Sequence, residues 1–298
     1  MQKIVAATDL SAPARHAAER AAMISSHSAG ELELVHVADL STLERLRLLI
    51  SEQPADMQYR VVSAGQERLA KLALSLKQRF DVHAGTHILT GKLLSELIQA
   101  CQALSADLLV CGAKGESFIR HFSLGTTALR LLNKSPCPVL VVKQPPHEAY
   151  KRVLVPVDFS FASLAAIQHA RSLAPHAMIV LMHAFEVPFE GKMRYANISD
   201  DIIHEYRILA RREALQKLEA LRQEANLSVA ESMLIVQHGD PGMRILEQEQ
   251  ERDCDLIVMG KHGENAVEEL LLGSVTRRVL EDCVSDVLVS TSQHEFKH

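Results

Sequence analysis

The chain has 298 residues, of which 47% are hydrophobic and 23% charged, and a formal net charge of −5. This composition excludes a disordered polar chain and is typical of a globular protein. The weakly acidic balance disfavours nucleic acid as a partner, because proteins that bind it usually present an excess of basic residues. No apolar run approaches the roughly 20 residues of a membrane-spanning helix, so no membrane partner is expected.

The compartment follows from the cysteines and from the first residues of the chain. Five cysteines occur without a CxxC spacing, which favours free thiols in a reducing compartment over disulfides or zinc ligands. The opening MQKIVAATDL enters a strand-like run at once and ends in an acid, unlike a signal peptide. We therefore expect a cytoplasmic protein.

In the first half, short apolar runs alternate with longer amphipathic ones. The short runs are rich in β-branched residues, as in strands covered on both faces; they span Lys3–Thr8, Glu31–Val37, Val82–Leu89, Asp107–Cys111 and Cys137–Val142. Helical patterns lie between them, at Pro13–Ser26, within Leu43–Arg79, at Leu93–Leu104 and at Thr126–Asn133. Strands alternating with helical crossovers predict a parallel sheet.

The same alternation returns after a short polar joint. The stretch KQPPHEAYK carries two prolines that interrupt the apolar pattern. We place the first domain at 1–143, a linker at 144–151 and the second domain at 152–298. Strands are predicted at Arg152–Val157, Met178–His183, Ser232–Gln237, Asp255–Met259 and Asp286–Ser290. A side-chain cap at Asp240 precedes one helix, and the charged stretch 200–225 predicts a solvated amphipathic helix.

Landmarks in the two halves recur at nearly one offset, which indicates a duplicated unit as long as a whole domain. The matching pairs are Asp9 with Asp158, His36 with His183, Gly112 with Gly260, and Gly125 with Gly273. The predicted fold is α/β, with two tandem doubly wound domains. Each is a five-stranded parallel sheet in the order 3-2-1-4-5, flanked by helices.

This topology predicts where a ligand binds. Ligands of such sheets lie beyond the carboxyl ends of the strands, where the winding direction reverses. Asp9 and Asp158 end the first strands, and Gly112 and Gly260 end the fourth. Glycines allow a ligand to approach the backbone closely, and a helix start offers free N–H groups to an anion. The crevice therefore suits a phosphate chain, with the acid placed to accept hydrogen bonds from a sugar hydroxyl.

The glycine spacing G-x2-G-x9-G-[S/T], present in both halves, resembles the nucleotide-binding pattern of the universal stress protein family. It comprises Gly112, Gly115, Gly125 and Thr126 in the first half, and Gly260, Gly263, Gly273 and Ser274 in the second. The stretches VLVPVDFS, LMHA and SPCPVLVV add to a resemblance that covers nearly the whole chain. It implies that ATP or a related adenine nucleotide binds in each half, with or without Mg²⁺. It also implicates Asp9, Val37 and Thr127 in the first half, and Asp158, Ala184, Val275 and Thr276 in the second.

The two halves depart from the family pattern in different ways. Ala7 stands where the second half has Pro156. The nine-residue stretch of the second half brings Glu264, Glu268 and Glu269 near a site for polyanions, whereas the first half offers Arg120 and His121. Motif geometry favours the second site as the tighter one, since exposed loop charges are screened and a divalent cation offsets acids.

Other signals carry less weight. GTHILTGKL differs from a P-loop, because five residues separate its glycines and Leu93 replaces the Mg²⁺-binding Ser/Thr. His36 and His183 have two interpretations. In the first they are functional, through contact with a bound base or through general acid–base catalysis. In the second, which we favour, they are structural. His83 and His87 lack a third ligand for a metal. No catalytic residue and no metal ligand is assigned.

Three functions are compatible with these observations. The first is a nucleotide-dependent switch or stabiliser in the stress response. The second is a slow ATP hydrolase or nucleotidyl transferase, at most a weak ATPase, because the repeated motif contains no strong base. The third is a nucleotide-free scaffold.

The last strands, Cys137–Val142 and Asp286–Ser290, each leave an unpaired edge, so we expect the halves to pair within one chain. A homodimer is left open, and no protein partner is indicated.

Overall fold

The computed structural model of the protein describes residues 2–38, 54–115, 124–187, 190–196, 198–261 and 272–291. The chain divides into two compact units, residues 1–149 and residues 150–298. Several residues singled out in the sequence lie outside the described residues, namely Arg120, His121, Gly263, Glu264, Glu268 and Glu269.

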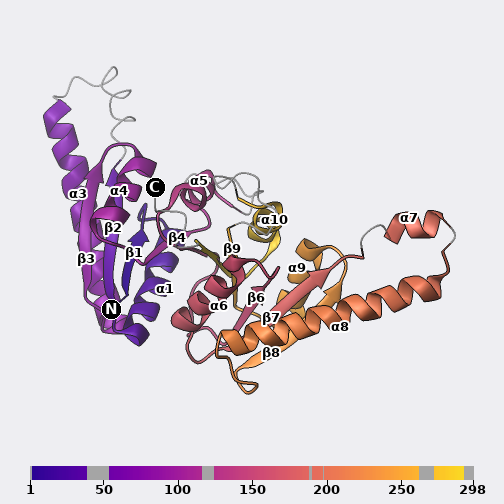
Figure 1. The fold of residues 1–298 in the computed structure, drawn as a ribbon. Helices are drawn as coiled ribbons and strands as arrows, with labels where there is room; N and C mark the ends of the chain where they lie inside the picture. The colour runs from indigo at the N-terminus through magenta and orange to yellow at the C-terminus, as the bar shows by residue number, and fades with distance from the viewer. Residues whose placement is uncertain are drawn as a thin grey trace. The chain divides into compact units, whose positions relative to one another are not determined.

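Five parallel strands form the sheet of the first unit (Figure 1). They are β1 (Lys3–Ala7), β2 (Glu31–Ala38), β3 (Ala84–Thr90), β4 (Leu108–Gly112) and β5 (Val139–Val142). Their hydrogen-bonded order is β3-β2-β1-β4-β5. In register, Ala6 lies opposite both Leu34 and Val110. The carboxyl ends of β1 and β4 therefore meet at the point where the winding reverses.

Two pairs of helices cover this sheet. Helices α1 (Ala12–Ser28) and α3 (Pro54–Phe80) pack on one face, and α4 (Leu93–Ala103) and α5 (Thr126–Lys134) pack on the other. Helix α1 begins where the Ser11 side chain accepts a hydrogen bond from Ala14 N and Pro13 occupies the first turn. Its inner face consists of fully buried alanines, so the helix lies close to the sheet; these are Ala17, Ala18, Ala21 and Ala22.

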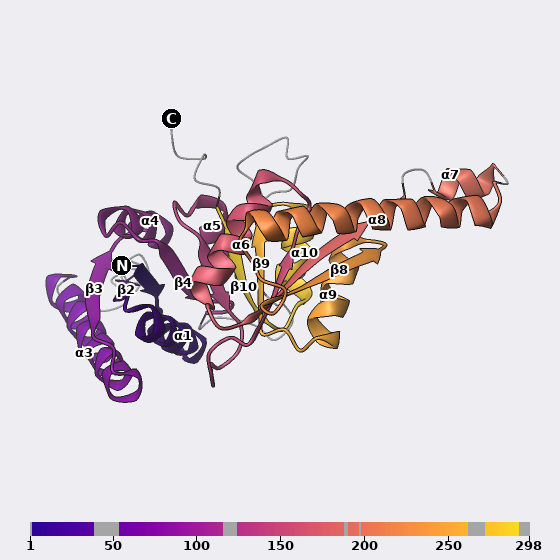
Figure 2. The ribbon, with the colours of Figure 1, turned by 60° about the horizontal axis from the view of Figure 1, so that its bottom comes forward.

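The second unit repeats this arrangement. Its strands are β6 (Arg152–Pro156), β7 (Met178–Phe185), β8 (Ser232–His238), β9 (Leu256–Gly260) and β10 (Asp286–Ser290), all parallel in the order β8-β7-β6-β9-β10. Helices α6 (Phe161–Leu173) and α8 (Asp200–Glu224) cover one face, and α9 (Pro241–Glu251) and α10 (Ser274–Asp282) cover the other. The short helix α7 (Glu190–Tyr195) lies beside the amino-terminal part of α8 (Figure 2).

The predicted α/β class, with parallel sheets and flanking helices, is confirmed, and the differences concern element ends and one short helix. The strand predicted from Cys137 begins at Val139, because Pro138 has no N–H to donate to a neighbouring strand. The third strand begins at Ala84 rather than Val82, after Asp81 takes a left-handed conformation with φ of 55°. Helix α7 was not predicted. Within the described ranges, no helix is long and apolar enough to cross a membrane.

Candidate functional site

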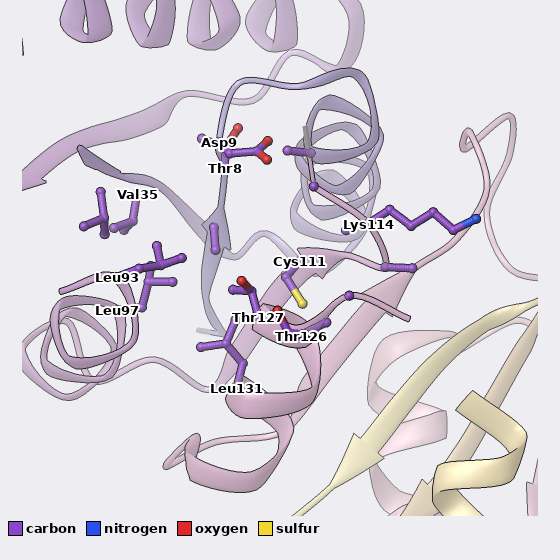
Figure 3. Close-up of a pocket in the computed structure, with 18 residues that line it drawn as sticks. Thr8, Asp9, Val35, Leu93, Leu97, Cys111, Lys114, Thr126, Thr127 and Leu131 are labelled. Carbon is purple, nitrogen blue, oxygen red and sulfur yellow. The ribbon is translucent and has the colours of Figure 1, made fainter. Parts of the chain in front are cut away.

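Each unit has a cavity at its switch point, beyond the ends of the first and fourth strands. The first measures about 200 Å³ and lies between β1, β2, α4 and α5 (Figure 3). The second measures about 520 Å³ and lies between β6, β7, α9 and α10. Pockets for small molecules usually have volumes of about 300–1,000 Å³, so the volume of the second cavity lies in this range and that of the first lies below it.

An aspartate stands at the end of the first strand in both units, held by the same turn. Asp9 is followed by Leu10 and Asp158 by Phe159, and each following residue has φ of 65°, in the left-handed region. The Asp9 carboxylate accepts a hydrogen bond from Ser11 N at 2.9 Å, and the Asp158 carboxylate accepts one from Ser160 N at 3.1 Å. The turn thus aims both carboxylates at the cavity.

Asp158 is held by two further groups. Its Oδ1 also accepts hydrogen bonds from Ser160 Oγ at 2.6 Å and from Ser163 Oγ at 2.9 Å. Both serines line the second cavity. Hydrogen bonds to a carboxylate are among the strong ones in proteins, so these contacts fix the orientation of the Asp158 side chain.

Three glycines of the first cavity lie so close to neighbouring atoms that a side chain at their positions would be crowded. A Cβ at Gly112 would lie 3.1 Å from Pro13 O, and one at Gly125 would lie 3.2 Å from Ala113 O. At Gly115 a Cβ would lie 3.0 Å from Asp9 Oδ2. A side chain at this last position would therefore crowd the carboxylate that faces the cavity.

Both cavities contain the start of a helix whose N-cap residue is a glycine. Gly125 precedes α5 and Gly273 precedes α10, and glycine has no side chain with which to cap the first-turn amides. Gly125 N donates to Ala113 O at 2.7 Å, and Gly273 N donates to Lys261 O at 3.0 Å, which anchors each helix start beside the fourth strand. The first-turn N–H groups of a helix have no intrahelical acceptor and carry the positive end of its dipole. Each helix start is thus suited to an anion.

The predicted residues gather at these cavities. The first cavity is lined by Asp9, Val37, Gly112, Gly115, Gly125, Thr126 and Thr127, and the second by Asp158, Ala184, Gly260, Gly273, Ser274, Val275 and Thr276. The Thr276 hydroxyl donates to Gly260 O at 3.0 Å, so it ties α10 to β9. Gly263 lies outside the described residues.

Sequence reasoning missed the apolar wall of each cavity. In the first unit Leu93 and Leu97 of α4 face the hollow together with Leu131 of α5 (Figure 3). Pro241 and Ile245 of α9 stand at the equivalent places in the second. The sequence did contain a signal for this wall. In both halves two apolar residues lie one turn apart at the start of the helix that follows the third strand. The wall supplies an apolar surface beside the acid and the helix start.

The two strand-end histidines have a structural contact in common. His36 Nδ1 lies 2.7 Å from Thr8 O, and His183 Nδ1 lies 2.8 Å from Val157 O. A carbonyl oxygen only accepts, so Nδ1 carries the proton and each ring fastens the second strand to the first. His183 also lines the second cavity, with its ring centroid 4.4 Å from that of Phe159.

Two kinds of reactive group remain among the described residues, a cysteine that lines the first cavity and the side chains that could bind a metal. Cys111 lines the first cavity, but burial raises the pKa of its thiol to about 12, so the thiol is protonated at neutral pH. Across the residues that the structure describes, no group of three His, Cys, Asp or Glu side chains is arranged to hold a metal ion.

Fold and site together define a tandem protein of two doubly wound domains, each with a crevice at the point where the winding reverses. The chain belongs to the Universal stress protein family, whose sequence model matches residues 1–143 and again residues 149–290.

Similar proteins share one or both domains. A universal stress protein of Methanocaldococcus jannaschii is 34% identical over 143 residues, which cover 47% of this chain and 81% of that protein. One of Mycolicibacterium smegmatis is 26% identical over 275 residues, covering 86% of this chain and 88% of that protein. The crystal structure of a universal stress protein from Archaeoglobus fulgidus superimposes with a TM-score of 0.68 at 19% identity. It covers 97% of this chain and 98% of that one, a likeness of fold.

Proposed function

We propose that this protein binds ATP or a related adenine nucleotide in each crevice, and that occupancy acts as a switch or stabiliser in a cytoplasmic stress response. One observation carries the proposal. In each unit an uncapped helix start, a strand-ending glycine and a strand-ending aspartate line a single cavity. A nucleotide has a matching group for each feature.

The assignment of parts follows from chemistry. Phosphates suit the first-turn N–H groups of α5 and α10, because such groups have no intrahelical acceptor and lie at the positive end of the helix dipole. Asp9 and Asp158 accept hydrogen bonds, which suits the hydroxyls of a sugar. The apolar walls from α4 and α9 suit the faces of a base. Any Mg²⁺ enters with the nucleotide phosphates.

We expect the second site to be the tighter one. Its cavity of about 520 Å³ is larger than the first, and its aspartate accepts three hydrogen bonds, two of them from serine hydroxyls whose residues also line the cavity. When the binding group is already held in place, less conformational freedom is lost on binding.

The five buried cysteines, all free, support a reducing compartment and hence the cytoplasmic location in this proposal.

Slow hydrolysis or nucleotidyl transfer is the alternative, and the lining residues favour binding over it. Backbone amides at a helix start stabilise a phosphate about equally before and during reaction, which tightens binding without accelerating chemistry. The carboxylates that line the described parts of the cavities are Asp9 and Asp158, both of which accept hydrogen bonds within their own turns.

The first experiment asks whether the purified protein retains a nucleotide. Small molecules released by denaturation are identified by mass spectrometry, and the emptied protein is titrated with ATP by calorimetry. An adenine nucleotide in the released fraction, or binding at up to two sites, supports the proposal. A protein that neither retains nor binds adenine nucleotides would instead be the nucleotide-free scaffold.

The second experiment tests the location. Gly273→Val adds a side chain at the start of α10, where φ of −59° and ψ of 151° accommodate valine, so the fold is expected to survive. We expect loss of the tighter ATP site and no change in the other. Ser199→Val is a matched control, since Ser199 precedes α8 with φ of −61° and ψ of 145° and also makes no capping hydrogen bond. Two-site binding unchanged in Gly273→Val would contradict the location.

A further inference from the structure

Helix α8 packs on the sheet with its second half alone. Ala214 and Leu218 are buried, and the helix contacts β7 and β8. The first half projects past the ends of these strands, accompanied by α7 (Figures 1 and 2). On this projecting part Ile203 is 2% exposed and Arg207 forms an ion pair with Glu190 of α7. One face of the projecting helix is therefore covered.

Another face of the same segment is apolar and exposed. Ile202 is 46% exposed, Tyr206 53% and Leu209 61%. Spacings of four and three residues place these side chains in one row along the helix. Ile198, 37% exposed, directly precedes the helix. We call Ile202, Tyr206 and Leu209 the α8 stripe; a row of large apolar side chains on a projecting helix is typical of an interaction surface.

Charges beside the stripe indicate what covers it. Glu205 and Arg212 are both exposed and lie seven residues apart, so they flank the stripe on the same side. Within the described part of the chain neither makes an ion pair, whereas Lys217 pairs with Glu213 and Arg222 with Glu219. A partner that fits the stripe should therefore present an apolar row with an acid and a base in the opposite order.

A second copy of α8 running antiparallel has this pattern. With Tyr206 of each copy against Leu209 of the other, residues flanking the same side of the two stripes face each other, as in antiparallel coiled coils. Glu205 of each copy then lies opposite Arg212 of the other, which forms two equivalent ion pairs about a two-fold axis. A parallel pairing would not bring these two charges together.

We propose that the α8 stripe is a self-association surface through which two copies of this chain form an antiparallel helix pair. The contact is short, two to three helical turns, and so buries less than the ~1,200–2,000 Å² of standard interfaces. We therefore expect a reversible dimer with a dissociation constant on the order of micromolar.

Sedimentation equilibrium of the full chain tests the proposal. The mass should rise with concentration from 33.0 kDa towards twice that value. Leu209→Glu should remain monomeric over the same range. Leu215→Glu is the matched control, because Leu215 is a 47% exposed leucine of the same helix outside the stripe, and this variant should dimerise as the wild type does. Thermal unfolding of each variant checks that the fold is intact.

Charge reversal tests the antiparallel register. Glu205→Arg and Arg212→Glu should each weaken the dimer roughly five-fold, through the loss of two exposed ion pairs. The double variant carries the reversed pairs and should recover wild-type association. A wild-type protein that stays monomeric is the result expected if another part of the same chain covers the stripe, and it overturns the proposal. So does a dimer that Leu209→Glu leaves intact, or a double variant as weak as the single ones.

Discussion

Asp158→Asn separates the role of the second-site acid in binding from its role in the fold. Oδ1 of Asp158 accepts three hydrogen bonds, from Ser160 N at 3.1 Å, Ser160 Oγ at 2.6 Å and Ser163 Oγ at 2.9 Å. Asparagine has the same shape and retains an oxygen for these donors. It removes the negative charge and replaces the second carboxylate oxygen with a donor. Alanine would abandon all three donors, so it could not distinguish the two roles.

The expected magnitude follows from these contacts. A hydrogen bond from a sugar hydroxyl to a carboxylate contributes about 1.5–3 kcal/mol when it is charge-assisted. Loss of this contact weakens ATP binding by roughly 10- to 150-fold. Within the fold the three bonds persist as neutral ones, and we expect the free energy of unfolding to fall by about 1–2 kcal/mol. The protein therefore stays folded while the second site weakens.

Calorimetric titration with ATP and urea unfolding measure the two effects on the same sample. Asp253→Asn is the matched control, since it removes the same charge from an 89% exposed side chain that does not line the cavity. Asp9→Asn should weaken the first site and leave the second unchanged. If Asp158→Asn bound ATP at both sites as tightly as the wild type, the acid would not contact the nucleotide and the reasoning would be refuted.

Two further predictions concern catalysis and stability. ATP turnover should lie far below ~1 s⁻¹, because amides at a helix start bind the ground state and the transition state alike. Arg120→Ala should alter ATP affinity more than turnover. A wild type with several turnovers per second, and a loss of that activity in Arg120→Ala, would favour the enzyme alternative. Glu249 is 1% exposed, and its Oε1 accepts hydrogen bonds from Val284 N at 2.9 Å, Ser285 N at 2.6 Å and Ser285 Oγ at 2.5 Å. Glu249→Ala removes the buried acceptor that these groups share and should lower the free energy of unfolding by about 2–4 kcal/mol, measured in urea; an unchanged midpoint would contradict this prediction.

The sequence by itself determined the duplication, the α/β class and the outline of each crevice, because these depend on local properties. Apolar periodicity specifies strands and helices, and a strand-ending Asp or Gly is recognisable from its neighbours alone. Parallel topology then requires Asp9 and Gly112, more than one hundred residues apart, to meet at one edge.

Tertiary structure alone decided which atoms complete the crevices. Leu93 and Leu97 look like ordinary residues of an amphipathic helix, and their place in the first cavity follows from how α4 packs on the sheet. Likewise, the Thr276 hydroxyl turns to Gly260 O, a contact set by the docking of α10.

The α8 stripe shows the same limit. The sequence indicates a charged amphipathic helix, yet it does not distinguish Ile202 from the adjacent Ile203. In the structure Ile203 is buried at 2% exposure, and Ile202 is 46% exposed. Adjacent residues on a helix point about 100° apart, so the face that packs is chosen by long-range contacts that a local pattern does not contain.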